Sequence, residues 1–200
     1  MLIAFEGLDQ SGKETQARHL RARLEQEGHK VRAASFPDYE TPIGAELKKA
    51  LAGEREFSAA VMQLLYVANR VEYKPRLESW LGAGDVVVCH RYRASSVAYG
   101  ESQGLDAGWL EEIQRFLPTA DVTVLLDIAP ATAVARKATG RDRFERDLGL
   151  LARVRESFPR QAAAEGWVII NAEQSRDEVG RAVEQAVLPR LARQSTPERS

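Results

Sequence analysis

The ten-residue stretch GLDQSGKETQ, which begins at Gly7, constrains the fold more than any other part of this sequence. Gly7, Gly12 and Lys13 match the phosphate-binding pattern G-x-x-x-x-G-K-[ST]. Glycines let the chain turn tightly and point several backbone N–H groups at one anion, and the lysine adds a positive charge that reaches the outer phosphates. The last position of the pattern, normally a hydroxyl that helps to hold magnesium, is Glu14.

The segments on either side of this stretch support a phosphate-binding loop. An apolar run, Leu2–Phe5, precedes it, and a segment with helical periodicity, Gly12–Glu27, follows it. Such a loop requires a strand before it and a helix after it, because the helix contributes the positive end of its dipole to the bound anion. A surface turn that matches by chance is the competing interpretation, and this context disfavours it. We therefore predict that residues 7–15 bind phosphate.

Short apolar runs recur along the chain and alternate with segments of helical periodicity. Each run is apolar for four to seven residues without alternation, which is typical of strands buried on both faces of a parallel sheet. The runs are Leu2–Phe5, Val31–Ser35, Asp85–Arg91, Asp121–Ile128 and Trp167–Ile170. The predicted fold class is therefore α/β, with a five-stranded parallel sheet flanked by helices.

Helical periodicity also predicts which helix faces are buried. The four predicted apolar faces are Ala17, Leu20 and Leu24; Val61, Leu64, Leu65, Ala68 and Val71, with Ser58 as N-cap; Leu151, Val154 and Phe158; and Val179, Val183, Val187 and Leu191. Pro75 should kink or interrupt the second of these helices, because proline removes a hydrogen bond inside a helix. A further helix is predicted over about Pro130–Thr139.

Composition indicates one globular domain over residues 1–193, followed by a polar tail at 194–200. The net charge of −1 gives no reason to expect binding to nucleic acid or to an anionic membrane. No apolar run approaches the roughly 20 residues of a membrane span, and the N-terminus lacks the charged region of a signal peptide. Cys89 is the only cysteine, which excludes an intrachain disulfide and fits a reducing cytoplasm.

Six motifs, in order along the chain, resemble those of the thymidylate kinases. The phosphate loop with its Asp9 resembles F-E-G-x-D-x-x-G-K-T-T-Q, and LLYVANRVE, Leu64–Glu72, resembles the helix L-L-F-x-A-N-R-x-E. The others are FPDYETPIG from Phe36, HRYRASSVAYG from His90, LPTADVTVLLDI from Leu117 and GRDRFE from Gly140. The resemblance covers about residues 2–191. The loop Asp and the ANR tripeptide favour this family over other P-loop kinases.

This resemblance has several implications for fold and activity. It implies a P-loop three-layer sandwich with a mobile lid at about residues 140–148. It implies that the chain transfers the γ-phosphoryl group of ATP, with magnesium, to dTMP and so produces dTDP for dTTP synthesis. It also implies a homodimer whose small-molecule partners are ATP and dTMP.

In the acceptor pocket, the resemblance assigns roles residue by residue. Arg70 and Arg91 correspond to arginines that bind the monophosphate, and a guanidinium fork suits a phosphate because it donates two parallel hydrogen bonds. Tyr66 lies where the family stacks an aromatic ring on thymine. Without the resemblance, Arg70 reads as a solvated helix residue and Tyr66 as core packing. The other predicted substrate contacts are Asp9, Phe36, Pro37, Leu51, Asn69, Ser95, Ser96 and Tyr99.

The resemblance assigns the ATP side of the site to the loop and the lid. The predicted ATP contacts are Gly7, Leu8, Asp9, Gln10, Ser11, Gly12, Lys13, Glu14, Thr15 and Arg136. One class of the family carries an arginine at the position of Gln10, and a second class supplies arginines from the lid. Because the lid here holds Arg141, Arg143 and Arg146, the second class is predicted. The predicted catalytic residues are Asp9, Lys13, Arg91, Arg141 and Arg143; Arg141 is the candidate for the charge that stabilises the transition state, and Arg146 is interpreted as solvated.

Two departures from the family pattern meet at the expected magnesium site. Glu14 replaces the metal-binding hydroxyl, and His90 replaces the Asp of D-R-Y. In one interpretation neither has a role at the metal, and Glu14 faces solvent at a helix start. In the other, the number of carboxylates is kept, and Glu14 binds magnesium directly or through one of its waters.

Two rival functions stay open from the sequence alone. A catalytically impaired nucleotide-binding homologue is favoured by Glu14 and His90, whereas the retained Asp9, Lys13 and Arg91 oppose it. A P-loop kinase for another nucleoside monophosphate would differ in acceptor specificity, so a comparison of acceptors distinguishes it.

Overall fold

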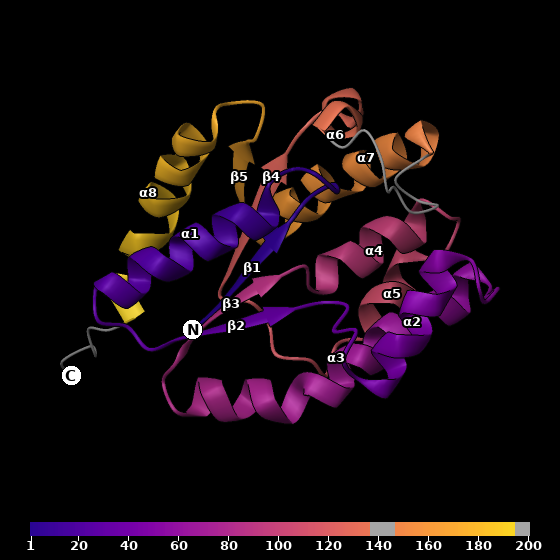
Figure 1. Ribbon diagram of the computed structural model, residues 1–200, viewed down its shortest axis with the longest axis horizontal. Helices are drawn as coiled ribbons and strands as arrows, with labels where there is room; N and C mark the ends of the chain where they lie inside the picture. Colours follow the sequence, from indigo (N-terminus) through magenta and orange to yellow (C-terminus); the bar gives the residue numbers. More distant parts are fainter. Residues whose placement is uncertain (137–146, 195–200) are drawn as a thin grey trace.

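The computed structural model describes residues 1–136 and 147–194 and is built on one parallel sheet (Figure 1). Its five strands lie in the order β2-β3-β1-β4-β5, and every neighbouring pair is parallel. The strands are β1 (Leu2–Glu6), β2 (Val31–Ser35), β3 (Val86–His90), β4 (Val122–Asp127) and β5 (Val168–Asn171). All five predicted strands are present, and the predicted fold class is confirmed.

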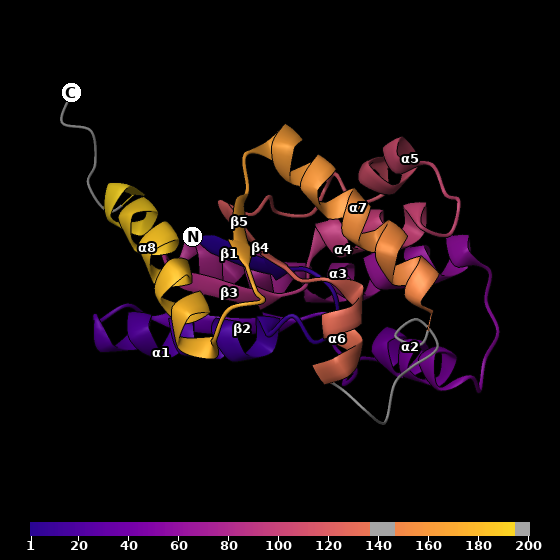
Figure 2. The ribbon, with the colours of Figure 1, turned by 90° about the horizontal axis from the view of Figure 1, so that it is seen from above.

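Helices cover both faces of this sheet and give the molecule three layers (Figures 1 and 2). The helices are α1 (Lys13–Gln26), α2 (Pro42–Ala52), α3 (Ala59–Gly82), α4 (Arg93–Glu101), α5 (Ala107–Glu112), α6 (Pro130–Arg136), α7 (Leu148–Glu165) and α8 (Arg176–Gln194). Helices α1 and α8 pack together on one face, whereas α3, α4 and α7 lie on the other. Within the described ranges, no helix is long and apolar enough to cross a membrane.

The strand order brings two chain segments to the same edge of the sheet. Strand β1 lies between β3 and β4, and Phe5 pairs in register with His90. Parallel strands end at one edge, so the loop after Glu6 meets Arg91 and the start of α4. Ligands in open α/β sheets bind beyond these carboxyl ends, which places the expected site here.

Three of the four predicted apolar helix faces are confirmed. Leu20 and Leu24 of α1 are fully buried, and Ala17 packs against the same core. The predicted residues of α7 and α8 also lie in this core: Leu151, Val154, Phe158, Val179, Val183, Val187 and Leu191. These helices therefore bury their apolar stripe against the sheet, as amphipathic periodicity predicts.

The fourth predicted face, on α3, is wrong for three of its five residues, although Leu65 is partly buried against a small core cluster. Val61, Leu64 and Val71 are 40%, 47% and 39% exposed. The opposite face is buried instead and carries Met62, Gln63, Val67, Asn69, Arg70, Tyr73 and Leu77. The periodicity was misleading because the buried face of α3 lines a pocket in part and therefore carries polar side chains.

The interruption expected at Pro75 is absent, because α3 runs without a break from Ala59 to Gly82, and the alternative expectation of a kink stays a prediction. Pro75 is exposed, while Tyr73 and Leu77 on either side of it are buried, and their packing outweighs the lost backbone hydrogen bond. The predicted N-cap is confirmed, since the Ser58 hydroxyl accepts from Val61 N at 3.3 Å.

Helices α2, α4 and α5 were not predicted. For α2 the sequence carries a start signal: Thr41 Oγ1 accepts from Gly44 N at 3.0 Å, and Pro42 occupies the first turn. Helix α6 is confirmed up to Arg136, and the rest of its predicted span lies outside the described residues.

Candidate active site

The predicted phosphate loop connects β1 to α1 at the centre of the sheet edge. Gly7 has φ +135°, and a Cβ at this position would lie 2.5 Å from the Leu126 carbonyl oxygen, so only glycine fits against β4. Gly12 has φ +93° and directly precedes α1, whose start has no side-chain cap. The backbone N–H groups of this first turn therefore face the place where an anion would bind.

Lys13 lies folded against its own loop. Its side chain is buried, and Nζ donates to the Leu8 carbonyl at 2.6 Å and to Ser11 Oγ at 3.5 Å. The other predicted ATP contacts of the loop, residues 7–15, lie on the same turn, and Glu14 is exposed in the first turn of α1. A lysine held beside loop amides can bind phosphate as a point charge.

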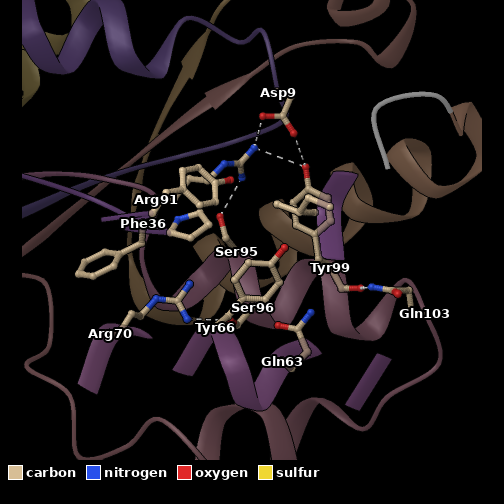
Figure 3. Close-up of a pocket in the computed structure, with 13 residues that line it drawn as sticks. Asp9, Phe36, Gln63, Tyr66, Arg70, Arg91, Ser95, Ser96, Tyr99 and Gln103 are labelled. Carbon is tan, nitrogen blue, oxygen red and sulfur yellow. Dashed lines mark hydrogen bonds and ion pairs between the residues drawn. The ribbon is translucent and has the colours of Figure 1, made fainter. Parts of the chain in front are cut away.

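Asp9 joins the loop to the end of β3 through an ion pair with Arg91 (Figure 3). Arg91 Nη2 donates to Asp9 Oδ1 at 2.6 Å, and the Tyr99 hydroxyl donates to Oδ2 at 3.0 Å. Burial acts to raise the pKa of Asp9, but the charges of Arg91 and Lys13 outweigh it, so the pKa lies well below its usual range. Asp9 is therefore a carboxylate at every physiological pH.

Arg91 is also held by Ser95, which donates in turn to a buried carboxylate that was not predicted. Arg91 Nη1 donates to Ser95 Oγ at 3.0 Å, and Ser95 Oγ donates to Glu6 at 2.6 Å. Glu6 also accepts from Tyr92 N at 2.8 Å. This glutamate fixes the start of α4, and the FEG tripeptide of the loop motif was the signal for it.

Arg70 reaches the same pocket from α3. Its side chain is buried and donates to Ser96 Oγ at 2.8 Å and to the Tyr92 carbonyl at 2.7 Å. Burial lowers its pKa from the usual value, and within the described ranges no carboxylate forms an ion pair with it. A buried cation held only by neutral oxygens is suited to an anionic ligand.

The predicted acceptor residues gather around one pocket between α3, α4 and the end of the sheet (Figure 3). Its lining includes all the predicted substrate contacts except Asn69: Asp9, Phe36, Pro37, Leu51, Tyr66, Arg70, Arg91, Ser95, Ser96 and Tyr99. Tyr39, Gln63 and Gln103 also line it and were missed. Gln63 lies one helical turn from Tyr66, and Gln103 one turn beyond Tyr99, so helical spacing was the available signal.

Asn69 lies behind the pocket and positions its wall. Its side chain accepts from Asp38 N at 2.8 Å and donates to the Asp38 carbonyl at 3.0 Å and to Thr41 Oγ1 at 2.8 Å. These bonds tie the loop after Pro37 to α3. Asn69 therefore positions this wall, and its predicted contact with substrate stays a prediction.

His90 and Arg136 lie at the edge of the loop. Burial, together with the charges of Lys13 and Arg91, lowers the pKa of His90 to about 3, so the imidazole is neutral at pH 7. Its Nδ1 lies 3.2 Å from Ser35 Oγ. Arg136 is exposed and donates to the Gln10 carbonyl at 3.3 Å and to the Ala172 carbonyl at 2.8 Å, which places it beside the loop as predicted.

The predicted lid arginines, Arg141, Arg143 and Arg146, lie outside the described residues. Across residues 1–136 and 147–194, no group of three or more His, Cys, Asp or Glu is placed to hold a metal ion.

Comparison with known proteins agrees with this geometry. The sequence model of the family described as thymidylate kinase matches residues 5–183. The chain belongs to the thymidylate kinase family. Membership makes it a phosphotransferase that acts on dTMP, and nothing in the comparisons favours either rival function.

Relatives from distant organisms share most of the chain. The thymidylate kinase of Arabidopsis thaliana is 34% identical over 95% of this chain and 72% of its own length. A probable thymidylate kinase of Thermococcus gammatolerans is also 34% identical, over 94% of this chain and 98% of its own. The solved thymidylate kinase of Candida albicans, described as having broad substrate specificity, aligns with a TM-score of 0.79 at 27% identity, covering 94% of this chain and 91% of that one.

Proposed function

We propose that this protein transfers the γ-phosphoryl group of ATP to dTMP in a magnesium-dependent reaction that yields ADP and dTDP. The observation that carries the proposal is the position of Arg91 between the phosphate loop and the pocket. Its Nη1 lies 3.3 Å from the Gly7 carbonyl, and its Nη2 lies 2.6 Å from Asp9. Phosphates bound on the loop and in the pocket would therefore meet at one guanidinium.

Phosphoryl transfer depends on positioning and charge neutralisation, and the described residues offer both. Lys13 and the loop amides hold the phosphates of ATP, while Arg70 and Arg91 hold the monophosphate of dTMP. Arg136 and the lid residues Arg141 and Arg143 complete the ATP side. Tyr66 stacks on the base, and Tyr99 lies beneath the deoxyribose.

The oxygen ligands that the loop offers fit magnesium only when a bound nucleotide supplies further ligands. Magnesium binds oxygen, keeps several waters and uses one or two carboxylates together with substrate phosphates. Asp9 and Glu14 are the carboxylates of the loop, and His90, which is neutral, cannot supply the missing charge. When bound, the ion neutralises charge on the phosphates during transfer.

We assign the metal-site carboxylate to Glu14. Its exposure in the first turn of α1 leaves the carboxylate free to turn toward a nucleotide. Glu14→Gln should therefore reduce kcat far more than His90→Asn, and added magnesium should recover part of the loss in Glu14→Gln. An equal loss of kcat in the two variants, or no loss in either, would contradict the assignment of Glu14 as the metal-site carboxylate.

We also propose that the protein is a homodimer that works in the cytoplasm. The exposed apolar stripe of α3, formed by Val61, Leu64 and Val71, is the surface that favours dimerisation, because an apolar helix face gains stability when a partner covers it. The free, buried thiol of Cys89 is typical of a reducing compartment.

The proposed reaction is tested by ADP formation from ATP and magnesium, with dTMP, dUMP, dCMP, dGMP and thymidine as separate acceptors. Turnover should be fastest with dTMP. Lys13→Met should lose at least about 100-fold in kcat, the usual loss for a group that stabilises transition-state charge. Lys48→Met, at an exposed position of α2, is the matched control and should keep full activity. Absence of turnover with every acceptor would reject the proposal.

A further inference from the structure

One side chain in the pocket has a buried acceptor that the protein itself does not satisfy. Gln63 of α3 is 1% exposed, and within the described residues its Oε1 has no hydrogen-bond partner. An unsatisfied buried carbonyl costs about 1–3 kcal/mol, so such atoms are rare unless a ligand or water completes them. Gln63 lines the pocket, so a bound ligand can reach it.

The position of Gln63 shows which part of the ligand it would meet. Gln63, Tyr66 and Arg70 are three and four residues apart, so they lie along one side of α3. Figure 3 shows Gln63 beside Tyr66 and at the end of the pocket away from Asp9. Asp9 and Arg91 mark the end where phosphate is transferred, so the base of the nucleotide must lie toward Gln63.

The chemistry of the base matches what Gln63 lacks. The hydrogen-bonding edge of thymine carries one donor, N3–H, between two carbonyl acceptors, whereas cytosine has an unprotonated acceptor at N3. A carboxamide oxygen can accept from N3–H while its NH₂ group donates to a neighbouring carbonyl. Against cytosine in the same pose, Oε1 in its present orientation would face a lone pair, and the carboxamide would have to rotate by 180° to donate to N3 through its NH₂ group.

We propose that Gln63 is a specificity-determining residue that accepts a hydrogen bond from N3–H of the thymine base and so selects dTMP over dCMP. This inference rests on the proposed function, because it assumes that a thymine nucleotide occupies the pocket. The same edge is present in uracil. Gln63 therefore separates thymine and uracil from cytosine, and it does not separate thymine from uracil.

Replacement of Gln63 by methionine tests the hydrogen bond, because methionine keeps the length of the side chain and removes both polar groups. Gln63→Met should lower kcat/KM for dTMP by about 10- to 100-fold, chiefly through KM, which is the range expected when a buried hydrogen bond is lost. The ratio of kcat/KM for dTMP to that for dCMP should fall, while the ratio for dTMP to dUMP and the KM for ATP should stay constant.

A matched control separates this role from a structural one. Gln114 is also 1% exposed and also has an unsatisfied Oε1, but it lies outside the pocket. Gln114→Met should show the same dTMP-to-dCMP ratio as the wild type. Thermal unfolding of both variants shows whether either change acts through stability alone.

Equilibrium binding of dTMP and dCMP, measured by calorimetry, is run beside the kinetics. One outcome separates the two proposals: the wild type shows no turnover but binds dTMP more tightly than dCMP, and Gln63→Met loses this preference. That result would reject the proposed function and keep the role of Gln63. Active wild type with an unchanged dTMP-to-dCMP ratio in Gln63→Met would overturn the role of Gln63. Binding of neither nucleotide by the wild type would overturn both.

Discussion

Both faces of α3 depart from the pattern of a usual surface helix: the buried face mixes polar with apolar side chains, and the exposed face carries apolar ones. The face toward the pocket carries Gln63 and Arg70, which are 1% and 2% exposed. The face toward solvent carries Val61, Leu64 and Val71, each about two-fifths exposed or more. An amphipathic helix normally buries its apolar stripe, so this departure requires a separate reason on each face.

Helix α3 shows that the periodicity of apolar residues in a sequence can identify an apolar helix face without showing whether the core, a ligand or another protein covers it. On the inner face, a substrate can satisfy a buried guanidinium and a buried carboxamide, so polar groups are stable there. On the outer face, a second protein surface can cover the valines and the leucine. The polarity of α3 therefore depends on the pocket and on what covers its outer face, as well as on the core residues Tyr73 and Leu77.

Replacement of Arg70 should produce the largest effect on the inner face. Arg70→Met should lower kcat/KM for dTMP by about 100-fold or more, because it removes a charge-assisted contact with phosphate. The kcat/KM of Arg70→Lys for dTMP should lie between those of the wild type and Arg70→Met, since lysine keeps the positive charge but cannot donate two parallel hydrogen bonds. Steady-state kinetics with dTMP varied at saturating ATP measures both variants.

Arg76→Met is the control for this prediction. Arg76 lies on the same helix, is exposed and stacks on Tyr73 and Trp80 at 5.3 and 4.8 Å from their ring centroids, away from the pocket. Its loss should leave the KM for dTMP unchanged. An Arg70→Met enzyme with an unchanged KM would show that the inner face is polar for some reason other than phosphate.

A charge on the outer face should dissociate the proposed dimer. Leu64→Glu buries a carboxylate in any interface formed by the stripe, and an unpaired buried charge costs several kcal/mol. The expected result is a dimeric wild type and a monomeric variant at micromolar concentration, measured by sedimentation equilibrium. Gln26→Glu, which adds a negative charge at an exposed position of α1 on the other face of the sheet, should stay dimeric. A monomeric wild type would leave the outer face unexplained.

The strands and the loop were predictable because their signals are local. Uninterrupted apolar runs, such as Val86–Val88, can only be central strands here, and Gly7 and Gly12 have backbone angles that a side chain would oppose. The confirmed faces of α7 and α8 follow from the same logic, since their apolar residues all lie in the main core against the sheet.

The residues that sequence reasoning missed depend on contacts between distant segments. Glu6 is buried by hydrogen bonds to Tyr92 and Ser95, which lie more than 80 residues away. Asn69, which was expected to touch substrate, bonds to Asp38 and Thr41 and does not line the pocket. Local motifs do not show such contacts, which join segments far apart in the sequence.

Tyr66 lies between Gln63 and Arg70 and should contribute less than Arg70. Tyr66→Ala should raise the KM for dTMP by about 5- to 100-fold, because stacking of a base on an aromatic ring contributes about 1–3 kcal/mol. Tyr66→Phe keeps the ring and should change the KM little, with binding followed by calorimetry. A large loss in Tyr66→Phe would assign the contribution to the hydroxyl and contradict stacking.

A second buried base gives the smallest expected effect and contrasts with Arg70. Arginine keeps its charge in proteins even where burial lowers the pKa, as it does for Arg70, whereas the pKa of His90 falls to about 3 and the imidazole stays neutral. An unfolded histidine titrates near 6.5, so between about pH 3 and 6.5 the unfolded state binds more protons than the folded state. The free energy of unfolding should therefore rise with pH through this window and level off above it.

His90→Asn isolates this contribution, because asparagine does not titrate. Urea unfolding at pH 7.5, 6.0 and 5.0 should show the wild type losing up to about 1.4 kcal/mol per pH unit below pH 6.5 in excess of the variant. Asp9, whose pKa is lowered, contributes only below about pH 4, where its unfolded form begins to bind a proton, so it does not obscure the comparison. Parallel slopes for the two proteins would mean that His90 accepts a proton in the folded state. In that case His90 would carry a positive charge below about pH 6.5 at the edge of the phosphate loop, where it would repel magnesium.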